Sequence, residues 1–339
     1  MFLSDAKPIP DAHIMKIAIV AHPQNVFPPA GGSVARVIWE SARRLPPQCQ
    51  VTIFSRRASG LGKSSCHEGL LLRRVAVTFD EQIVLRLVSY LRRFLGLEQF
   101  AWARGYFYFW FIVKVALCIR RRGFDLVHLH NYTHFATIMR WLNPTVPIVL
   151  HMHCHWLMEL DRGMAARRLA AVDAIVSPCA SLHDQTRARF SEHAAKCLVV
   201  HNGVDHRFFH KKRAASFSGN GCGRQHQQIL FVGRITPEKG VHVLLEAMAI
   251  VQRAFPEAAL LLAGGDFLTP ASMHARADGV YQKLEGLKRD YRGYLHQQIT
   301  RLGLAAQFVG YKSSAELTEY YSQARVVVCL LGKKFRHPF

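Results

Sequence analysis

The stretch from Phe231 to Gly240 reads FVGRITPEKG, and it decides how the second half of the chain folds. Its first apolar residues end a predicted strand, and Arg234 leaves the C-terminal tip of that strand. Thr236 suits the N-cap of a helix and Pro237 suits the first helical position, so Lys239 is predicted in the first turn. A strand that leads through a short loop into a helix is the building unit of a parallel α/β sheet.

The two cations of this stretch indicate a bound anion. A lysine in the first turn of a helix is locally unfavourable, because the free N–H groups already make that end positive. An anion reverses the balance, since backbone N–H groups, Arg234 and Lys239 can converge on a phosphate. The alternative is a solvated loop that carries two surface cations.

Outward from this stretch, short apolar runs alternate with amphipathic segments along the chain. Such alternation predicts an α/β fold in which helices cover both faces of parallel sheets. The strands that we predict are 16–20, 51–54, 126–130, 148–153, 174–177, 198–200, 229–232, 259–263, 307–309 and 326–329.

A polar, basic segment, HRFFHKKRAASFSGNGCGRQHQ, interrupts this alternation and is typical of a linker. The chain of 339 residues is long enough for two ordinary domains. We therefore predict a first domain at 15–205, a linker at 206–228, a second domain at 229–330 and an atypical tail at 331–339. Ligands of such sheets bind beyond the carboxyl ends of the strands, so we expect the site in a cleft between the domains.

Gly31 and Gly32 form a second candidate site, between the first predicted strand and a predicted helix. Glycine lets a ligand approach the backbone closely, and the start of a helix favours negative charge. The loop before them is too long for the glycine turn of dinucleotide-binding enzymes. A flexible turn is the alternative interpretation.

Histidines gather at two predicted strand ends. His151, His153 and His155 alternate along one strand and share a face, and three imidazoles are able to bind zinc. Side chains two apart on a strand rarely converge on one ion, however, and no carboxylate is adjacent. We therefore expect no metal, and we interpret a histidine at this strand tip as a polar residue that faces the cleft. The alternative for at least one of the three is a plain core histidine.

Three further polar residues are candidates for the same cleft. His130 ends the run VHLH, Asn202 lies in HNGVD before the linker, and Asp266 follows an Ala-Gly-Gly run. Asp266 is alternatively only a helix cap, and the Asn-Gly pair is also a turn signal.

The chain is strongly basic, with 44 Lys and Arg residues against 23 Asp and Glu and a formal net charge of +21. Such an excess attracts polyanions. Basic and aromatic residues interleave between Arg86 and Arg122, which fits an internal helix with a solvated basic edge or a helix that lies on an anionic membrane. We find no recognised nucleic-acid module, so no nucleic-acid partner is expected.

Sequence features also bear on location. The apolar run Gly105–Ile119 is shorter than a membrane span and contains Lys114. The eight cysteines form no C-x-x-C pair, and the N-terminus lacks the basic-then-apolar order of a signal peptide. We expect a cytoplasmic protein. If the basic, aromatic helix lies on a membrane, we expect the protein to bind peripherally to the inner face of the cytoplasmic membrane.

The segment VGRITPEKG resembles the V-G-R-x-x-x-E-K-G signature of glycosyltransferase family 4, a group with the GT-B fold. The other matching features, in the same order along the chain, are Gly31-Gly32, DLVHLHN, PIVLHMH, HNGVD, LLLAGGD and FVGY. The resemblance implies two Rossmann-like domains, the first on the acceptor side and the second binding a nucleotide sugar.

The resemblance also implies roles for single positions. Arg234 and Lys239 match the pair that holds the donor diphosphate, and Gly32, with Gly31 beside it, matches a backbone position near donor phosphate or acceptor. His153 aligns with a histidine near the reacting sugar. The resemblance implies transfer of a sugar from a UDP- or GDP-sugar, with retention of configuration at the anomeric carbon and without an essential metal or other cofactor. It also suggests a glycan or lipid-linked acceptor, in the assembly of cell-surface polysaccharide or lipopolysaccharide.

One departure from the family pattern concerns the last predicted strand, 326–329. The family continues there with a P-S-x-x-E-x-F-G loop and an E-x7-E pair, whereas this sequence continues with LLGKKFRHPF. We therefore expect an incomplete second domain, an exposed sheet edge with marginal stability, and reduced or absent catalysis. The alternative function is an inactive remnant that still binds a nucleotide or a membrane.

Overall fold

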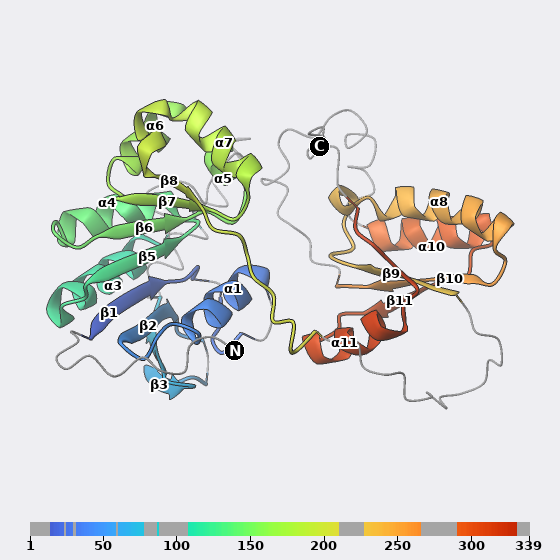
Figure 1. The fold of residues 1–339 in the computed structure, drawn as a ribbon, viewed down its shortest axis with the longest axis horizontal. Coiled ribbons are helices and arrows are strands. Elements are labelled where there is room, and N and C mark those ends of the chain that lie inside the picture. The colour runs from blue at the N-terminus through green and yellow to red at the C-terminus, as the bar shows by residue number, and fades with distance from the viewer. Residues whose placement is uncertain are drawn as a thin grey trace, which may run out of the picture. The chain divides into compact units, whose positions relative to one another are not determined.

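The computed structural model describes residues 14–23, 25–29, 32–58, 60–77, 87, 108–209, 227–265 and 290–330. The chain divides into two compact units, Met1–Gly203 and Val204–Phe339 (Figure 1). Several predicted features lie outside the described residues: Gly31, Asp266, the tail at 331–339, most of the predicted linker and most of the aromatic part of the basic segment.

The first unit contains one sheet of eight strands in the order β3-β4-β2-β1-β5-β6-β7-β8. All neighbouring strands are parallel except β3, which runs antiparallel to β4. The strands are β1 (Met15–Val20), β2 (Cys49–Arg56), β3 (Ser64–His67), β4 (Leu70–Val75), β5 (Leu126–His130), β6 (Ile148–His151), β7 (Ala174–Ser177) and β8 (Cys197–Val199).

Both faces of this sheet are buried, as expected for a parallel sheet. Ile17 and Ile19 of β1 belong to one hydrophobic cluster, whereas Ala18 and Val20 belong to another on the opposite face. The first cluster packs against α1, and the second packs against α3, α4 and α6. The helices of this unit are α1 (Ser33–Ala42), α3 (Phe109–Arg122), α4 (Thr133–Leu142), α5 (Trp156–Glu159), α6 (Arg162–Leu169) and α7 (Ala180–Arg189).

The second unit contains a parallel sheet of four strands in the order β11-β10-β9-β12. Figure 1 shows α8 and α10 on one side of this sheet and α11 on the other. The strands are β9 (Gln227–Val232), β10 (Ala258–Ala263), β11 (Ala306–Gly310) and β12 (Val326–Val328), and the helices are α8 (Val241–Ala254), α10 (Tyr291–Leu302) and α11 (Ser314–Gln323). Sequence explains why α11 starts where it does, because Ser313 and Glu316 form a reciprocal capping box.

The structure confirms the predicted α/β class with parallel sheets, and each of the ten predicted strands overlaps an observed one. Two details of the prediction are wrong. The strand predicted at 148–153 ends at His151, and the sequence analysis missed β3 and β4. The domain boundaries remain a prediction, although the division after Gly203 falls close to the predicted start of the linker.

The predicted exposed edge of the second sheet concerns β12, which pairs with β9 on one side. Val326 and Val327 are each about half exposed, at 50% and 49%. A largely apolar groove of about 510 Å³ lies between this strand and α8.

Within the described part of the chain, no helix combines the length and the apolar character that crossing a membrane requires.

Candidate functional site

The loop after β9 is fixed to its neighbours by backbone hydrogen bonds. The N–H of Gly233 donates to the carbonyl of Ala263 at 3.0 Å, and the N–H of Ile235 donates to the carbonyl of Gly265 at 3.2 Å. Ile235 is buried in the core of the second unit, at 4% exposure. The loop between β9 and α8 therefore has a defined path at the carboxyl end of the sheet, where ligands of parallel α/β sheets bind.

The predicted position of Lys239 is wrong in one respect. Residues Pro237–Lys239 form a single 3₁₀ turn, and Gly240 follows in the left-handed region with φ 69°. This glycine separates the turn from α8, so Lys239 precedes the helix instead of lying in its first turn. Thr236 is the N-cap residue of the 3₁₀ turn, but its side chain makes no capping hydrogen bond.

Three features of this segment favour an anion. Arg234 and Lys239 are both partly buried and flank the 3₁₀ turn, and α8 begins without a side-chain cap. Thr236 is only 5% exposed, and its Oγ1 has no hydrogen-bond partner among the described residues. A buried hydroxyl without a partner is costly, whereas a phosphate oxygen would accept its proton. The segment therefore offers a hydroxyl donor, two cations and a positive helix end to one ligand.

A second group of polar residues lies at the carboxyl ends of β1, β5 and β6 in the first unit. The Nε2 of His153 lies 2.8 Å from the Nδ1 of His130. The backbone N–H of His153 donates to the Oδ1 of Asn131 at 2.7 Å. His22, directly after β1, forms a hydrogen bond through its ring with the hydroxyl of Tyr132. These contacts fix His153, which the sequence analysis proposed as the residue near the reacting sugar.

Burial keeps this histidine group uncharged. It lowers the pKa of His128 and of His153 to about 3 and that of His151 to about 4. The pKa of His130 is also held well below its ordinary value, first by burial and then by the neighbouring imidazoles. Neutral imidazoles act as hydrogen-bond partners or as metal ligands, and they contribute no fixed positive charge.

The other predicted site residues are less closely grouped. Gly32 is the exposed N-cap residue of α1, with φ 84°, and a Cβ added there would meet nothing within 4 Å. Asn202 is exposed in an irregular segment after β8. His155 does not continue the strand as predicted but forms the N-cap position of α5. Gly31 and Asp266 lie outside the described residues.

Sequence reasoning missed three features of the two candidate sites. It did not identify His22 and Tyr132, and it did not identify the Thr236 hydroxyl, which has no partner among the described residues. His22 carried a usable signal, because it lies just beyond the carboxyl end of a buried strand, whereas His130 is the last residue of its strand. Thr236 was assigned only a capping role, and its lack of a partner is visible only in three dimensions.

Two connected α/β units, each with a mainly parallel sheet and with candidate site residues at the carboxyl ends of its strands, define the class of proteins built from two Rossmann-like domains. Within this class, the model of Glycosyltransferase Family 4 matches residues 30–208, which is more than half of the chain. The chain belongs to this family. A second model, Glycosyl transferases group 1, matches residues 214–333.

Curated relatives agree with this assignment. A putative glycosyltransferase of Bacillus subtilis, YtcC, is 27% identical over 47% of this chain and 41% of its own length. A phosphatidyl-myo-inositol mannosyltransferase of Mycobacterium tuberculosis is 30% identical over 44% of this chain and 40% of its own length. The matched region thus spans about two fifths of these relatives.

Solved structures share the fold. HepE of Anabaena, in complex with UDP and glucose, aligns with a TM-score of 0.56 and 16% identity, over 93% of this chain and 74% of its own. An α,α-trehalose 6-phosphate synthase of Burkholderia multivorans aligns with a TM-score of 0.61 and 14% identity, over 94% and 76% of the two chains. The chain therefore has the GT-B fold of glycosyltransferases.

Proposed function

We propose that this protein is a retaining glycosyltransferase that moves a hexose from a UDP- or GDP-sugar to a glycan or lipid-linked acceptor in cell-surface polysaccharide or lipopolysaccharide assembly. The observation that supports the donor side is the buried hydroxyl of Thr236, which lies between Arg234 and Lys239 in the sequence and has no partner in the described part of the chain. Family membership supports the reaction class, and the nucleotide in the HepE complex makes UDP the first nucleotide to test.

Charge explains how the segment would assist the reaction. The leaving diphosphate gains negative charge as the bond to the sugar breaks. Fixed cations and N–H dipoles that are already oriented toward this charge stabilise the transition state, by about 3–4 kcal/mol for a well-placed donor. Arg234 and Lys239 would take the part that a divalent ion has in other transferases, so we propose that no metal is essential for transfer.

His153 would act beside the reacting sugar. Its imidazole is neutral, since burial lowers its pKa to about 3, and its position is fixed by Asn131 and His130. A neutral imidazole can accept a hydrogen bond from a sugar hydroxyl or donate one to it, which orients the sugar without adding charge.

The donor proposal is tested by calorimetric titration of the full chain with UDP and with GDP. Arg234→Ala and Lys239→Ala should each weaken binding about 10- to 100-fold, because a charge-assisted hydrogen bond contributes about 1.5–3 kcal/mol. Arg253→Ala, in the last turn of α8, is the matched control and should bind as the wild type does. Equal affinity of the Arg234→Ala/Lys239→Ala double variant and the wild type would contradict the assignment.

Product analysis with a panel of UDP- and GDP-sugars separates transfer from binding alone. A new glycoside whose anomeric configuration matches that of the donor supports a retaining enzyme. Nucleotide binding without any product, under conditions in which a longer relative is active, would instead support the inactive remnant.

We also propose that the chain binds peripherally to the anionic inner face of the cytoplasmic membrane. Among the described residues, the helix α3 supports this proposal. It begins with exposed Phe109 and Trp110 and ends in exposed Arg120, Arg121 and Arg122. These arginines also stabilise the C-terminal end of the helix, which is their simpler role. Flotation with anionic vesicles at low salt, lost at high salt and with neutral vesicles, supports membrane binding. Absence of flotation at either salt concentration rejects it.

A further inference from the structure

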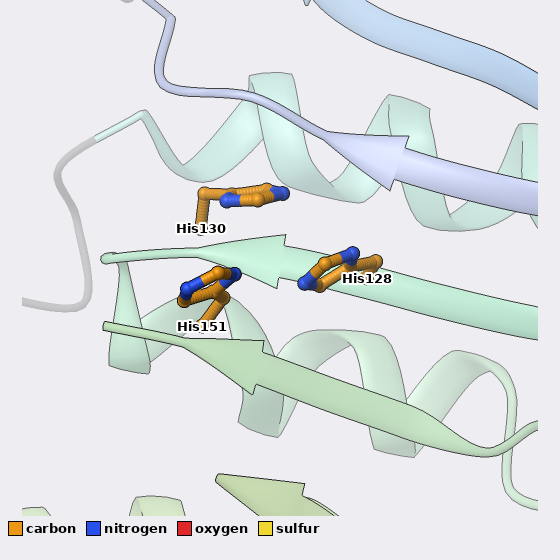
Figure 2. A group of neighbouring side chains, drawn as sticks. All are labelled: His128, His130 and His151. Atoms are coloured by element: carbon orange, nitrogen blue, oxygen red, sulfur yellow. The ribbon is translucent and has the colours of Figure 1, made fainter. Parts of the chain in front are cut away.

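Three histidines of the first unit converge on one face of its sheet. His128 and His130 lie two residues apart on β5, and His151 of β6 is the registered neighbour of His130. One ring nitrogen from each of the three lies within 4.8 Å of the others. Figure 2 shows the three rings on the same side of the two strands.

These rings carry unused hydrogen-bonding capacity. The Nε2 atoms of His128, His130 and His151 are buried and have no partner among the described residues. His130 is 3% exposed and His151 is 7% exposed, so water has little access to either. Each such buried nitrogen costs about 1–3 kcal/mol, and three in one place call for a ligand that satisfies them together.

The surroundings favour a cation that accepts neutral ligands. Registered neighbours in the sheet share a face with the histidines, and these neighbours are apolar: Ile19 and Val149 beside His128, and Val176 beside His151. The cluster itself contains no carboxylate. Mg²⁺ and Ca²⁺ require oxygen ligands, whereas imidazole suits Zn²⁺, Cu²⁺ and Ni²⁺.

His153 supplies the support that metal-binding histidines usually have. It lies 2.8 Å from the Nδ1 of His130, which fixes that ring and leaves its Nε2 for an ion. In tetrahedral zinc sites the ligand nitrogens lie about 3.3 Å apart, given Zn–N bonds of about 2.0–2.1 Å. The ligand nitrogens, which lie within 4.8 Å of one another, would therefore have to approach by up to about 1.5 Å to bind a zinc ion.

We propose that His128, His130 and His151 bind one Zn²⁺ ion through their ring nitrogens, with a fourth coordination position for water and with His153 orienting His130. This set differs from the run of three histidines that the sequence suggested, because its ligands come from two paired strands and not from one. The site belongs to the first unit, and its three ligands are different residues from Arg234 and Lys239 of the second unit.

The test is a zinc titration of the full-length, tag-free chain after treatment with a chelator, measured by competition with a chromophoric zinc indicator. The wild type should bind one equivalent tightly, and Co²⁺ at the same site should give the intense visible absorption of tetrahedral coordination. His128→Gln and His151→Gln should each weaken the tight site about 100-fold or more. His153→Gln should weaken it about 10- to 100-fold, as expected for a residue that supports a ligand.

The matched control is His183→Gln, a partly buried histidine of α7 whose ring forms a hydrogen bond with Asp184; this variant should leave the tight site unchanged. Far-UV circular dichroism shows whether each variant is folded. The zinc titration of the wild type tests the proposal even if a variant fails to fold. Absence of a tight equivalent in the wild type overturns the proposal. It is also overturned if the site persists in both folded ligand variants, or if His183→Gln abolishes it.

Discussion

The backbone at Gly264 packs directly against the backbone carbonyl of Gly233. A Cβ added at Gly264 would lie 1.7 Å from that oxygen, which no side chain tolerates. The N–H of Gly264 also donates to the carbonyl of Gly310 at 2.9 Å. The loops that follow β9, β10 and β11 therefore support one another, and the loop that carries Arg234 depends on a glycine 30 residues further along the chain.

Gly264→Ala should displace the loop that carries Arg234. Because the clash is with backbone, relief requires movement of the loop and not of a side chain, and we expect a loss of stability of about 1–3 kcal/mol. UDP affinity should fall about tenfold or more. Gly203→Ala is the control, since its added Cβ meets nothing within 4 Å. Calorimetry and urea unfolding measure both effects, and unchanged values for Gly264→Ala would show that the loops are not coupled.

Thr236→Val should change stability and nucleotide affinity in opposite directions. Valine keeps the branched shape and removes a buried hydroxyl that has no partner among the residues that the structure describes. The nucleotide-free chain should therefore gain about 1 kcal/mol in the free energy of unfolding. If that hydroxyl donates to the diphosphate, UDP binding should weaken about 5- to 10-fold. Thermal unfolding with and without UDP measures both. A variant that binds UDP as tightly as the wild type would remove Thr236 from the site.

Asn131 should prove to be a positioning residue for His153. It adopts φ 64°, a region that asparagine and aspartate tolerate better than most residues, and its Oδ1 accepts from the N–H of His153. Asn131→Asp keeps both properties, Asn131→Gly keeps only the backbone freedom, and Asn131→Ala keeps neither. The free energy of unfolding should fall in that order, by about 2–4 kcal/mol at the alanine variant.

Imidazole NMR signals distinguish positioning from stability alone. The signals of His153 should move in Asn131→Gly and Asn131→Ala but stay near those of the wild type in Asn131→Asp. If all three variants leave them in place, Asn131 affects only the backbone of its own turn.

Local pattern was sufficient for most of the fold. The apolar runs located ten strands, and the Phe231–Gly240 stretch located the loop of the proposed donor site. The missed strands, β3 and β4, form a short antiparallel edge pair around Gly69. β3 is largely exposed and offers no apolar run, so the periodicity of buried strands does not reveal it.

Details that depend on backbone conformation or strand register were beyond the sequence. Lys239 was expected inside a helix because Thr236 and Pro237 fit a helix start, but the left-handed Gly240 ends the turn after one 3₁₀ segment. The histidine cluster depends on the pairing of His130 with His151, and neighbouring positions on different strands follow only from the register. The run of histidines on one strand therefore did not reveal that His128, His130 and His151 lie together.

The stability of the first unit should fall as the pH is lowered from 7 to 4. Burial lowers the pKa of His22 to about 4, so its ring stays neutral in the folded chain above that pH. In the unfolded chain the same ring takes up a proton below about pH 6.5. Between these values the unfolded state binds more protons, so the free energy of unfolding decreases with decreasing pH, by up to about 1.4 kcal/mol per pH unit for one such group.

His22→Gln isolates this contribution. Glutamine does not titrate but can still form a hydrogen bond with the hydroxyl of Tyr132, so the variant should lose stability less steeply over the same pH range. Urea unfolding at pH 7, 6 and 5 in the presence of a chelator measures both slopes without a contribution from bound metal. Parallel pH dependences in the wild type and in His22→Gln would mean that His22 titrates alike in both states, and that its burial does not keep it neutral.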